Sequence, residues 1–302
     1  MIIPTFNRAE ILQECLESLV NQTIDRSLYE VLIINNNSTD NTEYIITQYT
    51  SRYANMRGVF EPMPGLSHAR NRGYKEAHSA WCFYLDDDAK ARPDTIARAL
   101  EVIEQYPFDC FGGVYYGWWK YGRPRWLPQD FGDKPLELQE TGILTRENAL
   151  CTGYNSGGVF VCRKSVLEKV NGFVADLGMN SGKIGYGEET YLQDILRSNE
   201  YVIGFDPLLV VDHLVGKHKL TIWWHLKSIY ASQRDAIFLV ESTLTLKRCI
   251  LTIGWEMVIF PFKFIKYLHQ LIFHKNYYWQ TFILDLFSPL FRKIGLLSGF
   301  MR

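Results

Sequence analysis

Three groups of residues in this 302-residue sequence have the types and spacing for acid–base or metal chemistry. Asp86, Asp87 and Asp88 are consecutive and follow an apolar stretch, and carboxylates this close raise one another's pKa unless a cation relieves them. Alternate residues of an extended segment face the same side, so Asp86 and Asp88 together could offer oxygen ligands to Mg²⁺ or Mn²⁺. A helix cap with surplus carboxylates would show the same pattern, and the triplet alone does not separate these interpretations.

The other two groups lie in the second half of the chain. Glu188 and Glu189 open a predicted helix after Gly-Tyr-Gly, where a carboxylate could accept the proton of an attacking hydroxyl. Acids also favour the first turn of any helix because of its dipole, so a purely structural role stays open. His213 ends a predicted strand after Asp212 and could supply a third metal ligand, or could be an ordinary packed or surface histidine.

The elements that must position these residues alternate between strand and helix, which predicts an α/β fold with a doubly wound, mostly parallel, Rossmann-like sheet. The polar clusters at 35–40 and 86–88 each follow a predicted strand, at the sheet edge where such folds bind ligands. Apolar runs that indicate strands lie at 2–3, 31–34, 81–85, 159–161 and 208–211, and helices are predicted around 11–19, 45–49, from 93, from 164 to a stop at 172, and from 188.

The overall composition is that of a globular protein, with 47% hydrophobic and 22% charged residues. A net charge of −1 gives no general argument for nucleic-acid binding. The six cysteines are scattered without a C-x-x-C pair, which favours reduced thiols and a cytoplasmic setting. We expect no signal peptide, because Met1 leads straight into a predicted strand, and no uncharged apolar run is long enough to span a bilayer.

The chain changes character after about residue 220, which predicts a catalytic domain at 1–220 and a helical region at 221–302. From Lys247 to Arg302 there are eight Lys or Arg residues against two acids, interleaved with aromatic and aliphatic side chains. Basic residues beside a broad apolar face suit a helix lying at an anionic membrane surface. Packing of that face on the catalytic domain or on a second subunit is the alternative.

Seven segments, taken in order, resemble the inverting GT-A-fold glycosyltransferases of family two. They cover roughly residues 1–215, about two thirds of the chain, and each alone is a weak signal. The segments are Ile2-Ile3-Pro4-Thr5-Phe6-Asn7-Arg8, the run from Glu30 to Asp40, the run from Gly65 to Gly73, Leu85-Asp86-Asp87-Asp88, Asn155-Ser156-Gly157-Gly158 with Gly172-Phe173, Gly187-Glu188-Glu189, and His213.

The resemblance implies a role for each matching residue in a reaction that uses a nucleotide sugar. Glu189 would be the catalytic base, with Glu188 a second candidate. The donor would contact Pro4, Thr5, Asn7, Arg8, Asn35, Asn37, Arg70, Asp86 and Asp87, with Asp86 or Asp87 at the ribose. The metal, Mn²⁺ or Mg²⁺, would be held by Asp88, Asp86 and His213, and the acceptor by Trp118, Trp119, Trp126 and Asn155, where the tryptophans could equally well only pack.

Two positions depart from the family pattern. Asn35 stands where the family usually has Asp, which removes a charge-assisted bond to the nucleobase of the donor. A UDP-sugar is favoured as the donor, but the identity of its nucleobase stays open. Glu189 stands where Asp is usual, which adds a methylene of reach.

The sequence therefore predicts an inverting, metal-dependent glycosyltransferase of polysaccharide or glycolipid synthesis. Its acceptor would be a saccharide or lipid-linked sugar, and the enzyme would be cytoplasmic and peripheral on the inner face of the cell membrane, with no nucleic-acid partner. A sugar-phosphate nucleotidyltransferase is the alternative enzyme, but it should carry a G-x-G-T-R loop that Pro4 to Arg8 lacks. A catalytically inactive membrane scaffold of the same fold is the non-enzymatic alternative.

Overall fold

The computed structural model describes residues 1–179, 184–236 and 246–301. Contacts divide the chain into two compact units, each described here by itself. Unit 1 comprises Met1–Trp118, Gly132–Ser181 and Glu188–Leu214, and unit 2 comprises Trp119–Phe131, Gly182–Gly187 and Val215–Arg302. The predicted division at 220 stays a prediction, because unit 2 also takes in two segments from the middle of the chain.

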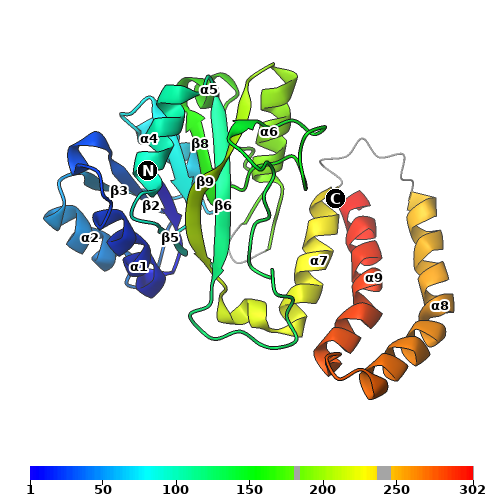
Figure 1. The fold of residues 1–302 in the computed structure, drawn as a ribbon. Helices are drawn as coiled ribbons and strands as arrows, with labels where there is room; N and C mark the ends of the chain where they lie inside the picture. The colour runs from blue at the N-terminus through cyan, green and yellow to red at the C-terminus, as the bar shows by residue number, and fades with distance from the viewer. Residues whose placement is uncertain (180–183, 237–245, 302) are drawn as a thin grey trace. The chain divides into compact units, whose positions relative to one another are not determined.

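The sheet of unit 1 runs in the order β3-β2-β1-β4-β8-β6-β9-β5, with β7 paired to β9 (Figure 1). The first four strands in this order are parallel, whereas β8 runs antiparallel to both β4 and β6. The strands are β1 Ile2–Thr5, β2 Val31–Asn35, β3 Met56–Phe60, β4 Trp81–Leu85, β5 Ala89–Ala91, β6 Cys110–Trp118, β7 Gly142–Ile143, β8 Val159–Arg163 and β9 Ile203–Leu214.

Helices cover both faces of this sheet because its strands are apolar on both faces. Ile3 and Ile33 pack with α1, α2 and α4 on one face, and their neighbours Ile2 and Leu32 pack with α3, α5 and α6 on the other. The helices are α1 Ala9–Val20, α2 Thr42–Arg52, α3 Leu66–Glu76, α4 Thr95–Gln105, α5 Lys164–Lys169 and α6 Glu188–Ser198, with a 3₁₀ turn η1 at Arg26–Leu28. The predicted α/β fold is confirmed.

The second half of the sheet differs in detail from the prediction. β9 extends over Ile203–Leu214, beyond the apolar run at 208–211 that predicts it, and His213 lies inside the strand. β6 and β5 were not predicted, because β6 is rich in glycine and tyrosine and β5 has only three residues. Both strands pair with β9.

Over its described residues, unit 2 contains three helices after a 3₁₀ turn, η2 at Lys217–Leu220. They are α7 Ile222–Ala236, α8 Leu246–Phe273 and α9 Trp279–Phe300, and α9 packs against both α7 and α8. The predicted C-terminal helical region is confirmed over the described residues, and the part at 237–245 and 302 lies outside them. Among the described residues, no helix combines the length and the apolar character needed to cross a membrane.

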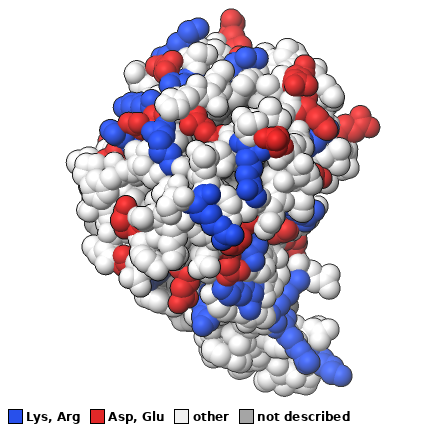
Figure 2. All heavy atoms as spheres, turned by 90° about the vertical axis from the view of Figure 1, so that its left-hand side faces the viewer, with Lys and Arg blue, Asp and Glu red and all other residues white. Residues whose placement is uncertain are grey.

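Charge of both signs is spread over the face shown in Figure 2, where acidic and basic side chains lie intermixed. Ion pairs within unit 1 include Lys90 with Glu14 and Arg72 with Glu76. Neither sign of charge dominates the whole of this face (Figure 2).

The close approach of β6 and β9 leads to a test of the sheet. Gly113 lies where the β6–β9 register shifts, and a Cβ there would be 2.0 Å from the carbonyl oxygen of Leu209. Since that atom is backbone and cannot turn aside, Gly113→Ala should lower the free energy of unfolding by about 1–3 kcal/mol or more in urea titrations. Gly142→Ala is the control, because its nearest neighbour would be 3.7 Å away. Equal midpoints for the two variants would contradict this account.

Candidate functional site

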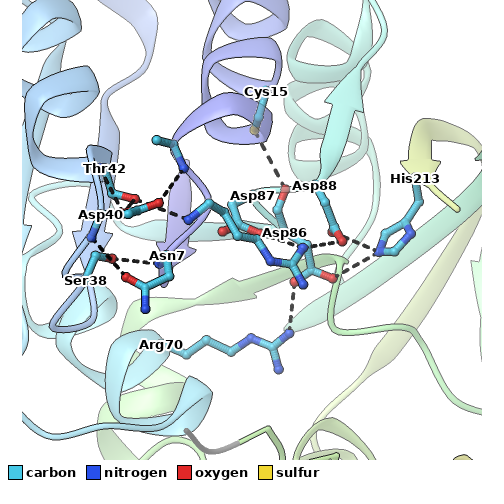
Figure 3. Close-up of polar contacts among 12 residues, drawn as sticks. Asn7, Cys15, Ser38, Asp40, Thr42, Arg70, Asp86, Asp87, Asp88 and His213 are labelled. Atoms are coloured by element: carbon cyan, nitrogen blue, oxygen red, sulfur yellow. Dashed lines mark hydrogen bonds and ion pairs between the residues drawn. The ribbon is translucent and has the colours of Figure 1, made fainter. Parts of the chain in front are cut away.

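The aspartate triplet and His213 are brought together by strand pairing. Asp86, Asp87 and Asp88 connect the end of β4 to β5, and β5 pairs antiparallel with β9 so that Ala89 lies opposite His213. The amide of Leu214 donates to the carbonyl of Asp88 at 2.8 Å and extends this pairing by one step. A histidine 125 positions along the chain is thereby fixed beside the carboxylates (Figure 3).

Asp86, Asp88 and His213 form a cluster that fits a divalent cation. The Nε2 of His213 lies 3.3 Å from Oδ1 of Asp88 and 3.6 Å from Oδ2 of Asp86. One ligand atom from each residue lies within 4.8 Å of the others. Two carboxylates and one imidazole form a donor set suited to Mn²⁺ and similar ions. The three predicted metal ligands therefore do converge.

The charges around the triplet leave an excess of carboxylate. Arg8 pairs with Asp88 at 2.5 Å and with Asp87 at 3.4 Å. Burial raises the pKa of Asp87 to about 7, although Arg8 opposes the rise. Burial would also raise the pKa of Asp86, but the hydrogen bond from His213 and the charge of Arg70 outweigh it and the pKa is lowered. A bound cation would relieve the remaining repulsion.

Arg70 links the triplet to the second pair of acids. Its guanidinium lies 3.4 Å from Oδ1 of Asp86 and donates to Oε1 of Glu188 at 2.9 Å, while its carbon lies 5.3 Å from the centre of the Phe173 ring. The side chains of Arg70 and Glu188 are only 3% and 7% exposed. A buried pair of this kind fixes both partners, because either one alone would be an unpaired charge away from water.

Two glycines just before β8 approach this site closely. A Cβ on Gly158 would lie 2.5 Å from Oδ2 of Asp86, and one on Gly157 would lie 2.6 Å from Nη2 of Arg70. Both distances are shorter than real contacts, so any larger residue would displace a carboxylate or guanidinium of the cluster. Gly158 was noted in the sequence as part of a motif, but its contact with Asp86 could not be inferred without the pairing of β4 and β8.

Glu188 and Glu189 begin α6 and have different surroundings. Burial and the neighbouring Glu189 raise the pKa of Glu188, and Arg70 opposes part of that rise. Oε2 of Glu189 is buried and has no hydrogen-bond partner among the described residues. Glu188 is thus engaged in the ion pair, whereas Glu189 retains an oxygen that could accept a proton.

The loops after β1 and β2 are joined by a set of short polar contacts. Asn7 lies in the loop after β1 with φ 53°, and its Oδ1 accepts hydrogen bonds from the amides of Thr39 and Asp40. Asp40 accepts from the amides of Ala9 and Thr42, so it stabilises the start of both α1 and α2 (Figure 3). The sequence showed Asp40 only as part of the polar cluster at 35–40 that follows a predicted strand. Its contact with the first helix has no local signal.

Asn35 is buried at the end of β2 and holds its turn in shape. Its Oδ1 accepts from the amide of Ser38 at 3.0 Å, and its Nδ2 donates to Glu43 at 2.7 Å. One lone pair and one N–H stay available for a ligand. Asn37 is exposed at φ 62°, and Pro4 and Thr5 are buried in β1. The contact with Glu43 was not foreseen from the sequence.

The four residues predicted for the acceptor lie in different surroundings. Trp118 ends β6, and the Nζ of Lys90 lies 3.5 Å from its ring centre. Trp119 and Trp126 belong to unit 2, where they pack on Phe131 and His225 respectively. Asn155 is 2% exposed in unit 1, and its Nδ2 donates to the carbonyl of Gly204. Their role in binding stays a prediction.

The sequence model of the family described as Glycosyl transferase family 2 matches residues 1–170, more than half of the chain. The chain belongs to this family. It is 34% identical to "Glycosyltransferase AglE" of Haloferax volcanii over 232 residues, which cover 74% of this chain and 73% of that protein. It is 35% identical to the "Poly(ribitol-phosphate) beta-glucosyltransferase" of Bacillus spizizenii over 121 residues, 39% of this chain but only 19% of that longer protein.

Solved structures give the same fold. A mannosyltransferase, PcManGT of Pyrobaculum calidifontis in complex with GDP-Man and Mn²⁺, matches 97% of this chain and 85% of its own with a TM-score of 0.65 at 15% identity. TarS 1–349 of S. aureus in complex with UDP-GlcNAc matches 98% of this chain and 89% of its own with a TM-score of 0.56 at 16% identity. Family 2 membership and the GT-A fold, both predicted from the sequence, are confirmed, and the chain is a glycosyltransferase.

The buried pair at Arg70 provides a test of this geometry in the family 2 enzyme. Arg70→Leu leaves Glu188 buried without a partner and should lower the free energy of unfolding by about 3–5 kcal/mol. Arg57→Leu is the control, because Arg57 is 37% exposed and pairs at the surface with Glu76, so its loss should cost no more than about 1 kcal/mol. In urea titrations the double variant Arg70→Leu/Glu188→Leu should recover part of the loss. If it recovers none, the ion pair is not the cause.

Proposed function

We propose that this glycosyltransferase moves a sugar from a nucleoside-diphosphate sugar to an acceptor hydroxyl by direct displacement, with inversion at the anomeric carbon. The observation that supports it best is the guanidinium of Arg70, which bonds to Asp86 of the cation cluster and to Glu188 of the second acid pair. One side chain thus spans a site for a leaving diphosphate and a site for a base. Direct displacement needs these two functions side by side.

Glu189 is the proposed base. Its free Oε2 takes the proton of the acceptor hydroxyl as that oxygen forms a bond to the anomeric carbon. The bond from the anomeric carbon to the diphosphate breaks at the same time, and the nucleoside diphosphate leaves with the bonding electron pair. Glu188 stays the second candidate, because burial and Glu189 raise its pKa, but its Oε1 is engaged by Arg70.

Asp86, Asp88 and His213 are the proposed ligands of Mn²⁺ or Mg²⁺, and their donor atoms suit such an ion. When bound, the ion would offset the negative charge that develops on the diphosphate. Arg8 and Arg70 add positive charge from the protein beside the same triplet. One structural neighbour binds a GDP-sugar and another binds a UDP-sugar, so the neighbours do not fix the nucleobase of the donor. We propose a UDP-sugar for this chain.

Asn35, Asn37 and Asp87 are proposed to contact the nucleoside, together with Pro4, Thr5, Asn7 and Arg8 from the first strand and loop. The acceptor is proposed to be a saccharide or a lipid-linked sugar, held by Trp118, Trp119, Trp126 and Asn155. The similarity to a poly(ribitol-phosphate) beta-glucosyltransferase supports a place in the synthesis of polysaccharides or glycolipids.

We further propose a peripheral position on the inner face of the cell membrane. The described surface of unit 2 is strongly basic: its exposed acidic side chain is Asp130, whereas its exposed basic side chains are Lys120, Arg123, Arg125, Lys217, Lys227, Lys247, Lys266, Lys275 and Arg292. A surface of one sign is attracted to anionic lipid within about 10 Å at moderate salt. Such a location would bring the enzyme to a lipid-linked acceptor.

Family membership sets aside the nucleotidyltransferase, since the chain matches glycosyltransferases over more than half its length. An inactive scaffold stays as the alternative to an active enzyme. Slow hydrolysis of a nucleotide sugar by purified protein would exclude the scaffold, and the configuration of a transferred sugar, measured by NMR, would distinguish inversion from retention.

The cation site is tested by ligand-dependent stability. Mn²⁺ together with the correct nucleoside diphosphate should raise the melting temperature, because ligands that bind only the native state stabilise it. Asp88→Ala should abolish this rise, since it removes one of three ligand residues. Asp212→Ala is the control: this neighbour of His213 pairs with Arg92 and lies outside the cluster, so the rise should persist. A rise that survives in Asp88→Ala removes Asp88 from the metal site.

The base is tested by its separation from donor binding. Glu189→Gln keeps the size of the side chain but cannot take up a proton, so turnover should fall by roughly 10²–10⁴-fold while donor affinity is nearly unchanged. Glu188→Gln should reduce turnover less and should lower stability through Arg70. Steady-state kinetics and donor titrations on both variants measure this. The reverse pattern would assign the base to Glu188.

A further inference from the structure

The helix α8 of unit 2 exposes apolar side chains along most of its length. Phe262 is 73% exposed, Ile265 67% and Trp255 63%. An apolar surface of this extent is rare on a monomer in water and indicates contact with something apolar. The large exposed hydrophobic residues of α8 are Leu246, Ile250, Leu251, Trp255, Met257, Val258, Phe262, Phe264, Ile265, Ile272 and Phe273.

The polar side chain at the middle of α8 lies on its inner side. Glu256 is only 4% exposed and pairs with Lys263 of the same helix and, at 2.6 Å, with Lys293 of α9. Lys293 also donates to the carbonyl of Thr252 at 2.9 Å. A helix on a water-soluble protein normally does the opposite, with its apolar side inside and its charges outside. Packing of α8 on α9 therefore hides the charge and leaves the apolar side uncovered.

The spacing of charges along α8 sets the length of this surface. From 249 to 262 the one charged side chain is Glu256, which is neutralised by its two lysines. Fourteen helical residues extend about 21 Å. Exposed Lys247 and Lys266 lie beyond the two ends of this uncharged stretch. Lysines at such positions can keep their ammonium groups at lipid headgroups while the apolar residues between them lie deeper.

We propose that α8 lies in the plane of an anionic bilayer with this apolar surface inserted below the headgroups. The inference deepens the peripheral membrane position proposed above and rests on it. The ion pairs of Glu256 allow the insertion, because they hold the one acid of α8 on the side turned away from lipid. A second copy of the chain is a poorer occupant, since it would bring Lys247 and Lys266 toward the same basic residues of its partner.

Insertion predicts that an acid on the outer side of α8 releases the protein from lipid. Phe262→Asp should lower partitioning of the full-length protein onto phosphatidylglycerol-containing vesicles by about tenfold or more, measured by sedimentation. Leu208→Asp is the matched control: Leu208 is 66% exposed in β9 of unit 1, and the substitution adds the same charge and removes a similar side chain. It should leave partitioning nearly unchanged.

Vesicles with brominated acyl chains distinguish insertion from attraction at the surface. They should quench tryptophan fluorescence in the wild type, and Trp255→Phe should reduce that quenching while sedimentation persists. Quenching should also remain at a salt concentration that screens the lysines. Sedimentation without quenching would mean that the membrane position is correct and the insertion is wrong.

Two further results would overturn the inference. If Phe262→Asp sediments like the wild type, the apolar surface does not contact lipid. If light scattering shows that Phe262→Asp turns a dimer into a monomer without an effect on vesicles, the occupant is a second copy. The rise in melting temperature with Mn²⁺ and nucleoside diphosphate, measured in every variant, shows that the variant is folded and separates this result from failure of the proposed transferase activity.

Discussion

The site depends on one buried arginine side chain. The guanidinium of Arg70 lies between Asp86 and Glu188, which come from the end of β4 and the start of α6. Burial and the neighbouring Glu189 raise the pKa of Glu188 to about 8 although Arg70 opposes the rise, and without Arg70 this pKa would be higher still. With it, one acid of the pair is engaged and the free oxygen of the other can accept a proton. Just before β8, Gly157 and Gly158 leave room for the guanidinium of Arg70 and the carboxylate of Asp86, which occupy the space where their Cβ atoms would lie.

Much of the first half of the fold could be predicted from the sequence. Buried parallel strands such as β2 and β4 are continuous apolar runs, and their helices carry a clear apolar side. The polar residues that follow these strands lie at one edge of the sheet for a geometric reason, and the sequence contains that information. Residue types and spacing proposed Asp86 and Asp88 as metal ligands, but only the family resemblance joined His213 to them, since nothing local to His213 connects it to Asp88.

The remainder depends on contacts between distant parts of the chain. β5 is too short for a pattern, and its pairing with β9 is what places His213 opposite Ala89. The same limit applies to Arg70 and Glu188, which are separated by 118 positions and could be recognised only as members of separate motifs. The division into two units could not be inferred from the sequence either, because it also depends on contacts between distant residues. Residues 119–131 resemble a loop in sequence, and their contacts assign them to unit 2.

The helices of unit 2 show where composition misleads and where it helps. The excess of lysine and arginine after residue 247 predicts a basic surface, and the exposed residues of unit 2 agree. The apolar residues of α8 would ordinarily be assigned to a core. They are exposed because the contact with α9 is made partly by Glu256, Lys263 and Lys293. Only one side of a helix can face a neighbouring helix, so the opposite side of α8 stays uncovered. A buried ion pair contributes little net stability compared with apolar packing. Its retention at this contact is explained if the apolar side of α8 is needed outside.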